Sequence, residues 1–129
     1  MIEELLYVEL KSGHADSGPA WIGMPNYSKS KSTIYFNGMA FKRIKGGGIS
    51  GNYNEVHSGN EYWISGVKKN NEDRHWSGKG SIEIDKSVVE IYLELLGLSV
   101  LPKNLKVVTL KPAAPTVELH ELENKSLHE

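Results

Sequence analysis

The sequence Thr33-Ile34-Tyr35-Phe36-Asn37-Gly38-Met39-Ala40-Phe41-Lys42-Arg43-Ile44 carries the clearest local structural signal in the chain. Asn-Gly stands between two runs that are rich in β-branched and aromatic residues. Both central residues of a type I′ turn need a positive φ, and Asn and Gly tolerate this best. The pattern therefore predicts an antiparallel hairpin in which residues 33–36 pair with residues 39–42.

Further β-forming runs lie on both sides of this hairpin. Short alternating or apolar runs bounded by Gly, Pro, Asn and Ser are typical of strands. Such runs cover residues 5–10, 20–23, 53–56, 61–67, 81–84 and 105–110. Residues 24–31, by contrast, are polar and predict a connection.

One helix is predicted over residues 86–96. Asp85 suits the N-cap position, and Gly97 suits the position after the last helical residue. The apolar residues between them repeat at helical spacing, which indicates one buried stripe: Val88, Val89, Tyr92, Leu95 and Leu96. We therefore expect a mainly β (α+β) fold, either a bent antiparallel sheet or a small SH3-like barrel of five to seven strands, with this helix packed on it.

The length and composition indicate a single domain. The chain has 129 residues, of which 13 are glycine, a surplus that favours many turns. We expect a globular domain over residues 1–111 and an acidic tail over 112–129, because Pro112 and Pro115 cannot continue a central strand. The chain contains no cysteine, which excludes disulfides and thiolate metal sites.

The start of the chain is acidic and lacks the features of a signal peptide, and no apolar run is long enough to span a bilayer. These observations favour a cytoplasmic protein with no membrane partner.

Basic and aromatic residues are concentrated in the middle of the chain. Five cations and no acid lie between Trp21 and Gly48, although the net charge of the whole chain is only −1. In nucleic-acid-binding proteins, cations meet phosphates and flat rings stack on bases. The candidate ligand-binding residues are Lys29, Lys31, Lys42, Arg43, Trp63, Lys68, Lys69, Arg74 and Trp76. Two other roles stay open, since lysines also solvate strands and aromatic residues also fill cores.

Two acid-x-His tripeptides form a second candidate site. They are Glu55-Val56-His57 and Asp73-Arg74-His75. Residues i and i+2 of a strand share a face, so each carboxylate would lie beside its imidazole. Brought together, the two pairs could bind a divalent metal or supply general acid–base groups. Alternatively, these are exposed loop residues, and Arg74 makes a structural salt bridge to Asp73 or Glu83.

The segments Tyr62-Trp63-Ile64-Ser65-Gly66-Val67-Lys68-Lys69, Asp73-Arg74-His75-Trp76 and Ile82-Glu83-Ile84-Asp85 resemble a stretch found in a group of small bacterial proteins without an established activity. Ser28 to Lys31 and Tyr35 to Gly38 also look like theirs. The resemblance covers about residues 20–93. It implies a compact intracellular bacterial domain and assigns no ligand or catalytic residue.

These observations favour a binding or interaction module that uses no cofactor. Its partner is expected to be a nucleic acid, another anionic molecule or a protein, contacted through the basic and aromatic hairpin region. The alternative is a small metal- or His-dependent enzyme that uses the two acid-x-His pairs.

Overall fold

The Asn37-Gly38 turn forms in a computed structural model of the chain, which describes residues 5–14, 17–46, 48, 51–69, 73–74 and 80–112. Asn37 has a φ of 49° and Gly38 a φ of 74°, the positive values that a type I′ turn requires. Phe36 lies opposite Met39, and Thr33 lies opposite Lys42. The predicted hairpin and its register are confirmed.

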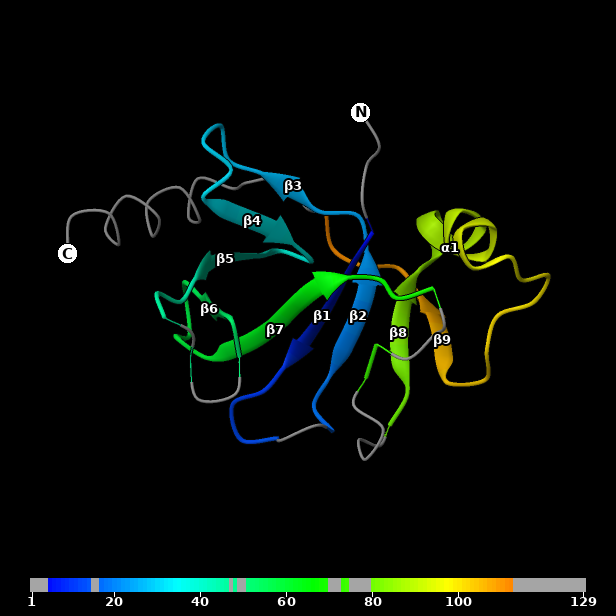
Figure 1. Cartoon of the computed structure of the whole chain (residues 1–129), viewed down its shortest axis with the longest axis horizontal. Helices are drawn as coiled ribbons and strands as arrows, with labels where there is room; N and C mark the ends of the chain where they lie inside the picture. The colour runs from blue at the N-terminus through cyan, green and yellow to red at the C-terminus, as the bar shows by residue number, and fades with distance from the viewer. Residues whose placement is uncertain are drawn as a thin grey trace.

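The hairpin belongs to a single sheet that curls into a half-barrel (Figure 1). Its strands are β1 (Leu6–Leu10), β2 (Ala20–Gly23), β3 (Asn26–Tyr27), β4 (Thr33–Phe36), β5 (Met39–Arg43), β6 (Tyr53–Glu55), β7 (Glu61–Gly66), β8 (Ile82–Asp85) and β9 (Leu105–Val108). They are arranged in the order β3-β4-β5-β6-β7-β1-β2-β8-β9. The mainly β fold is confirmed, although the described residues form nine strands where five to seven were expected.

The pairing is antiparallel from β3 across to β2 and becomes parallel at the other end of the sheet. Strand β8 runs parallel to both β2 and β9. The helix provides the crossover that the parallel strands β8 and β9 need. The antiparallel pairing that the sequence predicts therefore holds from β3 to β2 and not at this end, because a strand's own residues do not specify which strand becomes its neighbour.

The predicted helix begins as a 3₁₀ turn, η1 (Lys86–Val88), and continues as α1 (Val89–Leu96). The Asp85 side chain accepts a hydrogen bond from the Ser87 amide at 3.4 Å. Gly97 has a φ of 68°, which ends the helix as predicted. Tyr92 is buried as expected, whereas Leu95 is 41% exposed, so the buried stripe is narrower than the sequence predicts.

Alternation along β1 places apolar side chains on both faces of the sheet. One face, which we call the helix side, packs against η1 and α1 and consists of Leu5, Tyr7, Ala20, Ile22, Ile82, Ile84, Val88, Tyr92 and Leu105. The other face, which we call the inner side, lies within the curl of the sheet and consists of Leu6, Val8, Ile34, Phe36, Phe41, Tyr62 and Ile64. Strand β1 is thus buried from both directions.

The segment that follows β9 returns to the β4–β5 hairpin. Leu110 packs against the inner side. The Lys111 amide donates a hydrogen bond to Asn37 Oδ1 at 2.9 Å. Gly23 lies beneath this segment, where an added Cβ would come within 3.1 Å of both Leu110 and Phe36. The hairpin turn is therefore held in place by residues more than 70 positions away in the chain.

Strand β3 is a further correction, since it lies within the predicted polar connection at 24–31. It is only two residues long, and both are exposed, so the sequence carries no apolar pattern to predict it. The proposed tail from residue 113 onward lies outside the described residues. In the described part of the chain, no helix is long and apolar enough to cross a membrane.

Candidate functional site

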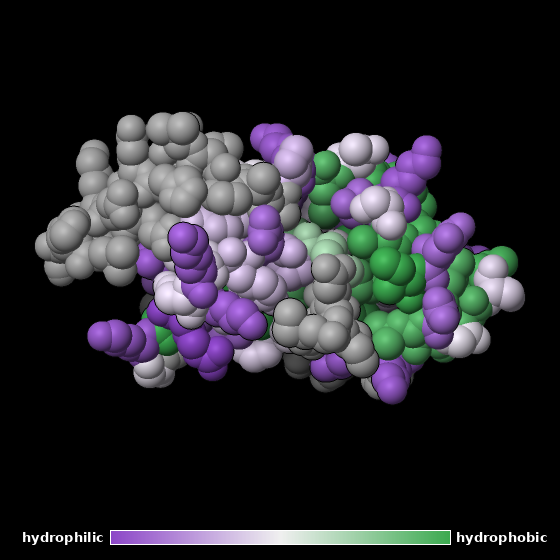
Figure 2. All heavy atoms as spheres, turned by 90° about the horizontal axis from the view of Figure 1, so that it is seen from above, coloured by the Kyte–Doolittle hydropathy of each residue, from purple (hydrophilic) through white to green (hydrophobic). Residues whose placement is uncertain are grey.

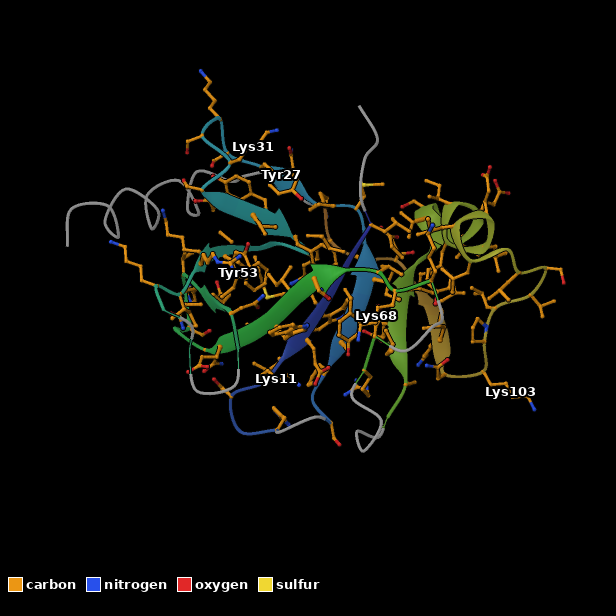
Figure 3. All side chains as sticks on the ribbon, in the orientation of Figure 1. Lys11, Tyr27, Lys31, Tyr53, Lys68 and Lys103 are labelled. Atoms are coloured by element: carbon orange, nitrogen blue, oxygen red, sulfur yellow. The ribbon has the colours of Figure 1, made fainter. Side chains whose placement is uncertain are left out.

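The candidate basic residues fall into two separate groups. Lys29, Lys31, Lys42 and Arg43 belong to the β3–β4 loop and to β5, at one end of the strand order. Lys68 and Lys69 follow β7, and Arg74 lies in the connection from β7 to β8. In Figure 3, Lys31 lies on the β3–β4 loop, well separated from Lys68. The seven basic candidates therefore do not form a single face.

The first group lies where the β4–β5 hairpin opens. The amide of Ser28 donates to the Thr33 carbonyl at 3.0 Å, and the amide of Thr33 donates to Ser28 Oγ at 3.1 Å. These bonds close a tight loop that exposes Lys29 and Lys31. Because Thr33 lies opposite Lys42, the loop is positioned beside the end of β5.

Lys42 and Arg43 point to opposite faces of β5, as neighbours in a strand must. Arg43 shares the inner side with Tyr53, its partner on β6, and its guanidinium carbon lies 5.8 Å from the centre of the Tyr53 ring. Tyr27, on the neighbouring edge of the sheet, lies opposite Ile34 and therefore also faces the inner side. Its ring is 40% exposed. Rings and exposed cations thus occur together at this end.

We call this surface the hairpin-end face and define it by Tyr27, Lys29, Lys31, Arg43 and Lys45. Its four cations are exposed, and no carboxylate in the described part of the chain forms a salt bridge with any of them. Its positive charge is therefore available to an anionic partner.

Two glutamates near this end are held by backbone amides. Glu55 is 5% exposed and accepts hydrogen bonds from the amides of His57 and Ser58, each at 2.8 Å. The side chain of Glu61 accepts one from the Gly51 amide at 2.9 Å. Both carboxylates therefore stabilise turns in the chain.

One member of the second group, Arg74, contacts a buried carboxylate on the helix side of β1. Glu9 is 1% exposed and accepts a hydrogen bond from the Tyr7 hydroxyl. The Lys11 ammonium lies 2.9 Å from Glu9 Oε2, and the Arg74 guanidinium lies 3.6 Å from the same atom. Arg74 also donates to the Gly18 carbonyl at 2.8 Å. Arg74 therefore fastens the β7–β8 connection to β1, and its salt bridge is to Glu9, not to the expected Asp73 or Glu83.

Asp73 also holds the β7–β8 connection in place. Its Oδ1 accepts a hydrogen bond from the Lys68 amide at 2.7 Å, and the residue is buried. Burial raises the pKa of Asp73. Burial also raises the pKa of Tyr92 to about 12, with a smaller contribution from the negative charge of Asp73. Burial is the main cause of the raised pKa of Tyr7, and the hydrogen bond to Glu9 adds to it.

The remaining described candidates, Trp63, Lys68 and Lys69, are more accessible. Trp63 lies opposite Glu9 across β7 and β1, and it is 41% exposed. Lys68 and Lys69 are exposed. Trp21, by contrast, donates from Nε1 to Glu83 Oε1 at 3.0 Å, which is a structural role. Trp76 and His75 lie outside the described residues.

The structure does not assemble the described members of the two acid-x-His pairs. Strand β6 ends at Glu55, and residues 56–58 form a turn, so His57 does not continue the strand as the pairing required. Glu55 lies opposite Phe41 on the inner side, whereas Asp73 lies near Tyr7 and Tyr92 on the helix side. Among the described residues, no three His, Asp or Glu side chains are grouped to hold a metal ion.

Sequence reasoning missed the buried group at Glu9. A signal for it exists in Tyr7-x-Glu9-x-Lys11, since three polar-tipped side chains at alternate positions of a strand must share a face. It also missed Tyr53, whose ring is recognised only once β5 and β6 are paired.

Comparison with protein-family models, with curated proteins and with solved structures finds no match to this chain.

Proposed function

We propose that the protein is a small binding module that engages single-stranded nucleic acid through the hairpin-end face. The observation that carries this proposal is the presence of four exposed cations without carboxylate partners in the described residues, beside the exposed ring of Tyr27. Such a surface combines charge for phosphates with a platform for a base.

Single strands suit this surface better than a duplex. The cations come from a short loop and from the end of β5, and the described residues place no helix on this face to enter a major groove. An exposed ring gives no advantage with stacked base pairs, whereas it can stack on the unpaired bases of a single strand.

The test is a titration with a labelled single-stranded oligonucleotide over a range of salt concentrations. Each phosphate contact contributes roughly 0.7 to the slope of log K against log salt for single strands. Lys29→Gln together with Lys31→Gln should therefore flatten the slope by about 1.4 units. Lys103→Gln with Lys106→Gln is the matched control, because these exposed lysines lie at the opposite end of the molecule and should leave the slope unchanged (Figure 3).

A second variant and its matched control test the contribution of stacking. Tyr27→Ala should weaken binding by roughly 1–3 kcal/mol if the ring stacks on a base. Trp63→Ala removes a ring of almost equal exposure, 41% against 40%, from outside the hairpin-end face and should have no effect. No measurable binding to DNA or RNA at about 50 mM salt would refute the proposal and leave an acidic protein surface as the partner to test.

A further inference from the structure

Strand β9 forms the far edge of the sheet among the described residues, and its outer side has no neighbouring strand. An unprotected edge is a template for pairing with another chain. Natural proteins usually shorten such an edge, place proline or lysine in it, or cover it. Strand β9 is as long as its neighbour β8, four residues each, and contains no proline, and Lys106 is its one charged residue.

The register of β8 and β9 shows which backbone groups of the edge are available. Ile82 pairs with Leu105, and the Ile82 amide donates to the Asn104 carbonyl at 2.8 Å. In a parallel ladder this register directs the N–H and C=O groups of Lys106 toward β8, and those of Val107 away from it. The Leu105 amide is used by the Pro102 carbonyl at 3.1 Å. Val107 is therefore the residue of β9 that offers both a donor and an acceptor on the outer side.

Apolar side chains gather at the same end of the molecule. Figure 2 shows a hydrophobic surface on the side that carries α1. The exposed large apolar residues of α1, of the loop that follows it and of β9 are Ile91, Leu95, Leu98, Val100 and Val107. Val100 is 74% exposed. By contrast, the described residues outside this end include only Tyr27 and Trp63 as exposed large hydrophobic side chains.

We propose that this end of the molecule binds a second copy of the chain, with β9 pairing antiparallel to β9 of the second copy about a two-fold axis. A two-fold axis perpendicular to the sheet keeps both α1 helices on the same face. Their exposed apolar residues then approach one another beside the paired edges. The result is one sheet that continues through both copies.

The charges on β9 select one register. A two-fold axis that relates two identical antiparallel strands passes between the two copies of one residue, which lie directly opposite each other on the same face. Near the middle of β9 that residue is either Lys106 or Val107. The first choice places two ammonium groups directly opposite each other, which is unfavourable. The second places Val107 against Val107 of the second copy, and each donates a hydrogen bond to the other. Lys106 then lies opposite Val108 of the second copy.

The available area favours a second copy as the occupant. Five partly exposed apolar side chains on each copy, with the backbone of two edge strands, bury on the order of 1,000 Å² in total, which is near the lower limit for a specific interface. A single short peptide on the β9 edge would leave most of the apolar surface of α1 exposed.

The test is the solution mass of the full chain, measured by light scattering during size exclusion. At protein concentrations of roughly 10–100 μM, a dimer with a Kd near 1 μM is mostly assembled, and the mass should be twice the 14.4 kDa of one chain. Val107→Pro removes one outward N–H and keeps the β8–β9 ladder, because proline is tolerated where the amide faces outward. This variant should be a monomer.

Two further variants separate loss of the interface from loss of the fold. Leu95→Glu changes an exposed position of α1 and should also give a monomer, while its melting curve in dilute solution stays cooperative. Tyr27→Glu, at a position of similar exposure on the other edge strand, should remain a dimer. A wild-type monomer throughout this concentration range would overturn the proposal. So would a dimer that survives both Val107→Pro and Leu95→Glu, because its interface would lie elsewhere.

Discussion

Glu9 carries a carboxylate at a position that is almost fully buried. A carboxylate that is almost inaccessible to water is tolerated only when cations and hydrogen bonds replace its hydration. The Tyr7 hydroxyl, the Lys11 ammonium and the Arg74 guanidinium supply these interactions. Arg74 comes from a different part of the chain, so its contact with Glu9 also fixes the β7–β8 connection.

We expect Arg74→Ala to lower the free energy of unfolding by about 3 kcal/mol, because removing one partner of a buried ion pair leaves the other insufficiently compensated. Urea denaturation followed by tryptophan fluorescence measures this loss. Lys69→Ala, at an exposed position after β7, is the matched control and should change stability by less than about 0.5 kcal/mol.

If Arg74 acted mainly on a ligand, the result would differ. Stability would then be nearly unchanged by Arg74→Ala, and oligonucleotide binding would fall instead. We expect the reverse, since Arg74 lies outside the hairpin-end face and against Glu9.

At the scale of single elements, the β4–β5 hairpin depends on both its turn conformation and a distant contact. Asn37 adopts a positive φ, and its side chain accepts the hydrogen bond of the Lys111 amide. Asn37→Gly removes the acceptor and leaves a residue that adopts a positive φ readily, so it should cost about 1 kcal/mol. Asn37→Ala removes the same acceptor and puts at this positive φ a residue without the polar side chain by which Asn tolerates it, so it should cost roughly 1–2 kcal/mol more than Asn37→Gly.

Urea denaturation of Asn37→Gly, of Asn37→Ala and of the unaltered chain measures the two losses in the free energy of unfolding. Equal stability of the two variants would contradict the assignment of turn strain. An Asn37→Gly variant as stable as the unaltered chain would mean that the Lys111 contact contributes nothing measurable.

The same elements show how far sequence alone determines the fold. The hairpin register, the end of the helix at Gly97 and most strand positions follow from local preferences, and these predictions are confirmed. Strand β3 and the parallel pairing of β8 depend on distant partners, so no local pattern indicates them. Leu95 is exposed although helical periodicity places it in the apolar stripe, because periodicity does not specify how much of that stripe the sheet covers.

The candidate site was predictable only in part, because some of its residues come together only when the whole sheet is assembled. Lys29, Lys31 and Arg43 are close in the sequence and lie at the same end of the sheet, because the hairpin keeps neighbours in sequence close in space. Arg74 lies elsewhere, against Glu9, and a buried arginine and a surface arginine look identical before the chain folds. The tyrosines beside the cations come from β3 and β6, so their role appears only when the sheet is assembled.

The two proposed surfaces make one joint prediction. Strands β3 and β9 lie at opposite ends of the sheet order, so pairing through β9 carries the two hairpin-end faces to the far ends of the dimer. A single-stranded oligonucleotide long enough to reach both faces should then bind more tightly than a short one, by about 100-fold, because the second contact becomes intramolecular. Val107→Pro should abolish this gain and leave the affinity for the short strand unchanged. Titration with oligonucleotides of increasing length measures the gain, and sedimentation confirms that one dimer occupies each long strand. An equal dependence on length in the unaltered chain and in Val107→Pro would show that the two faces do not act together.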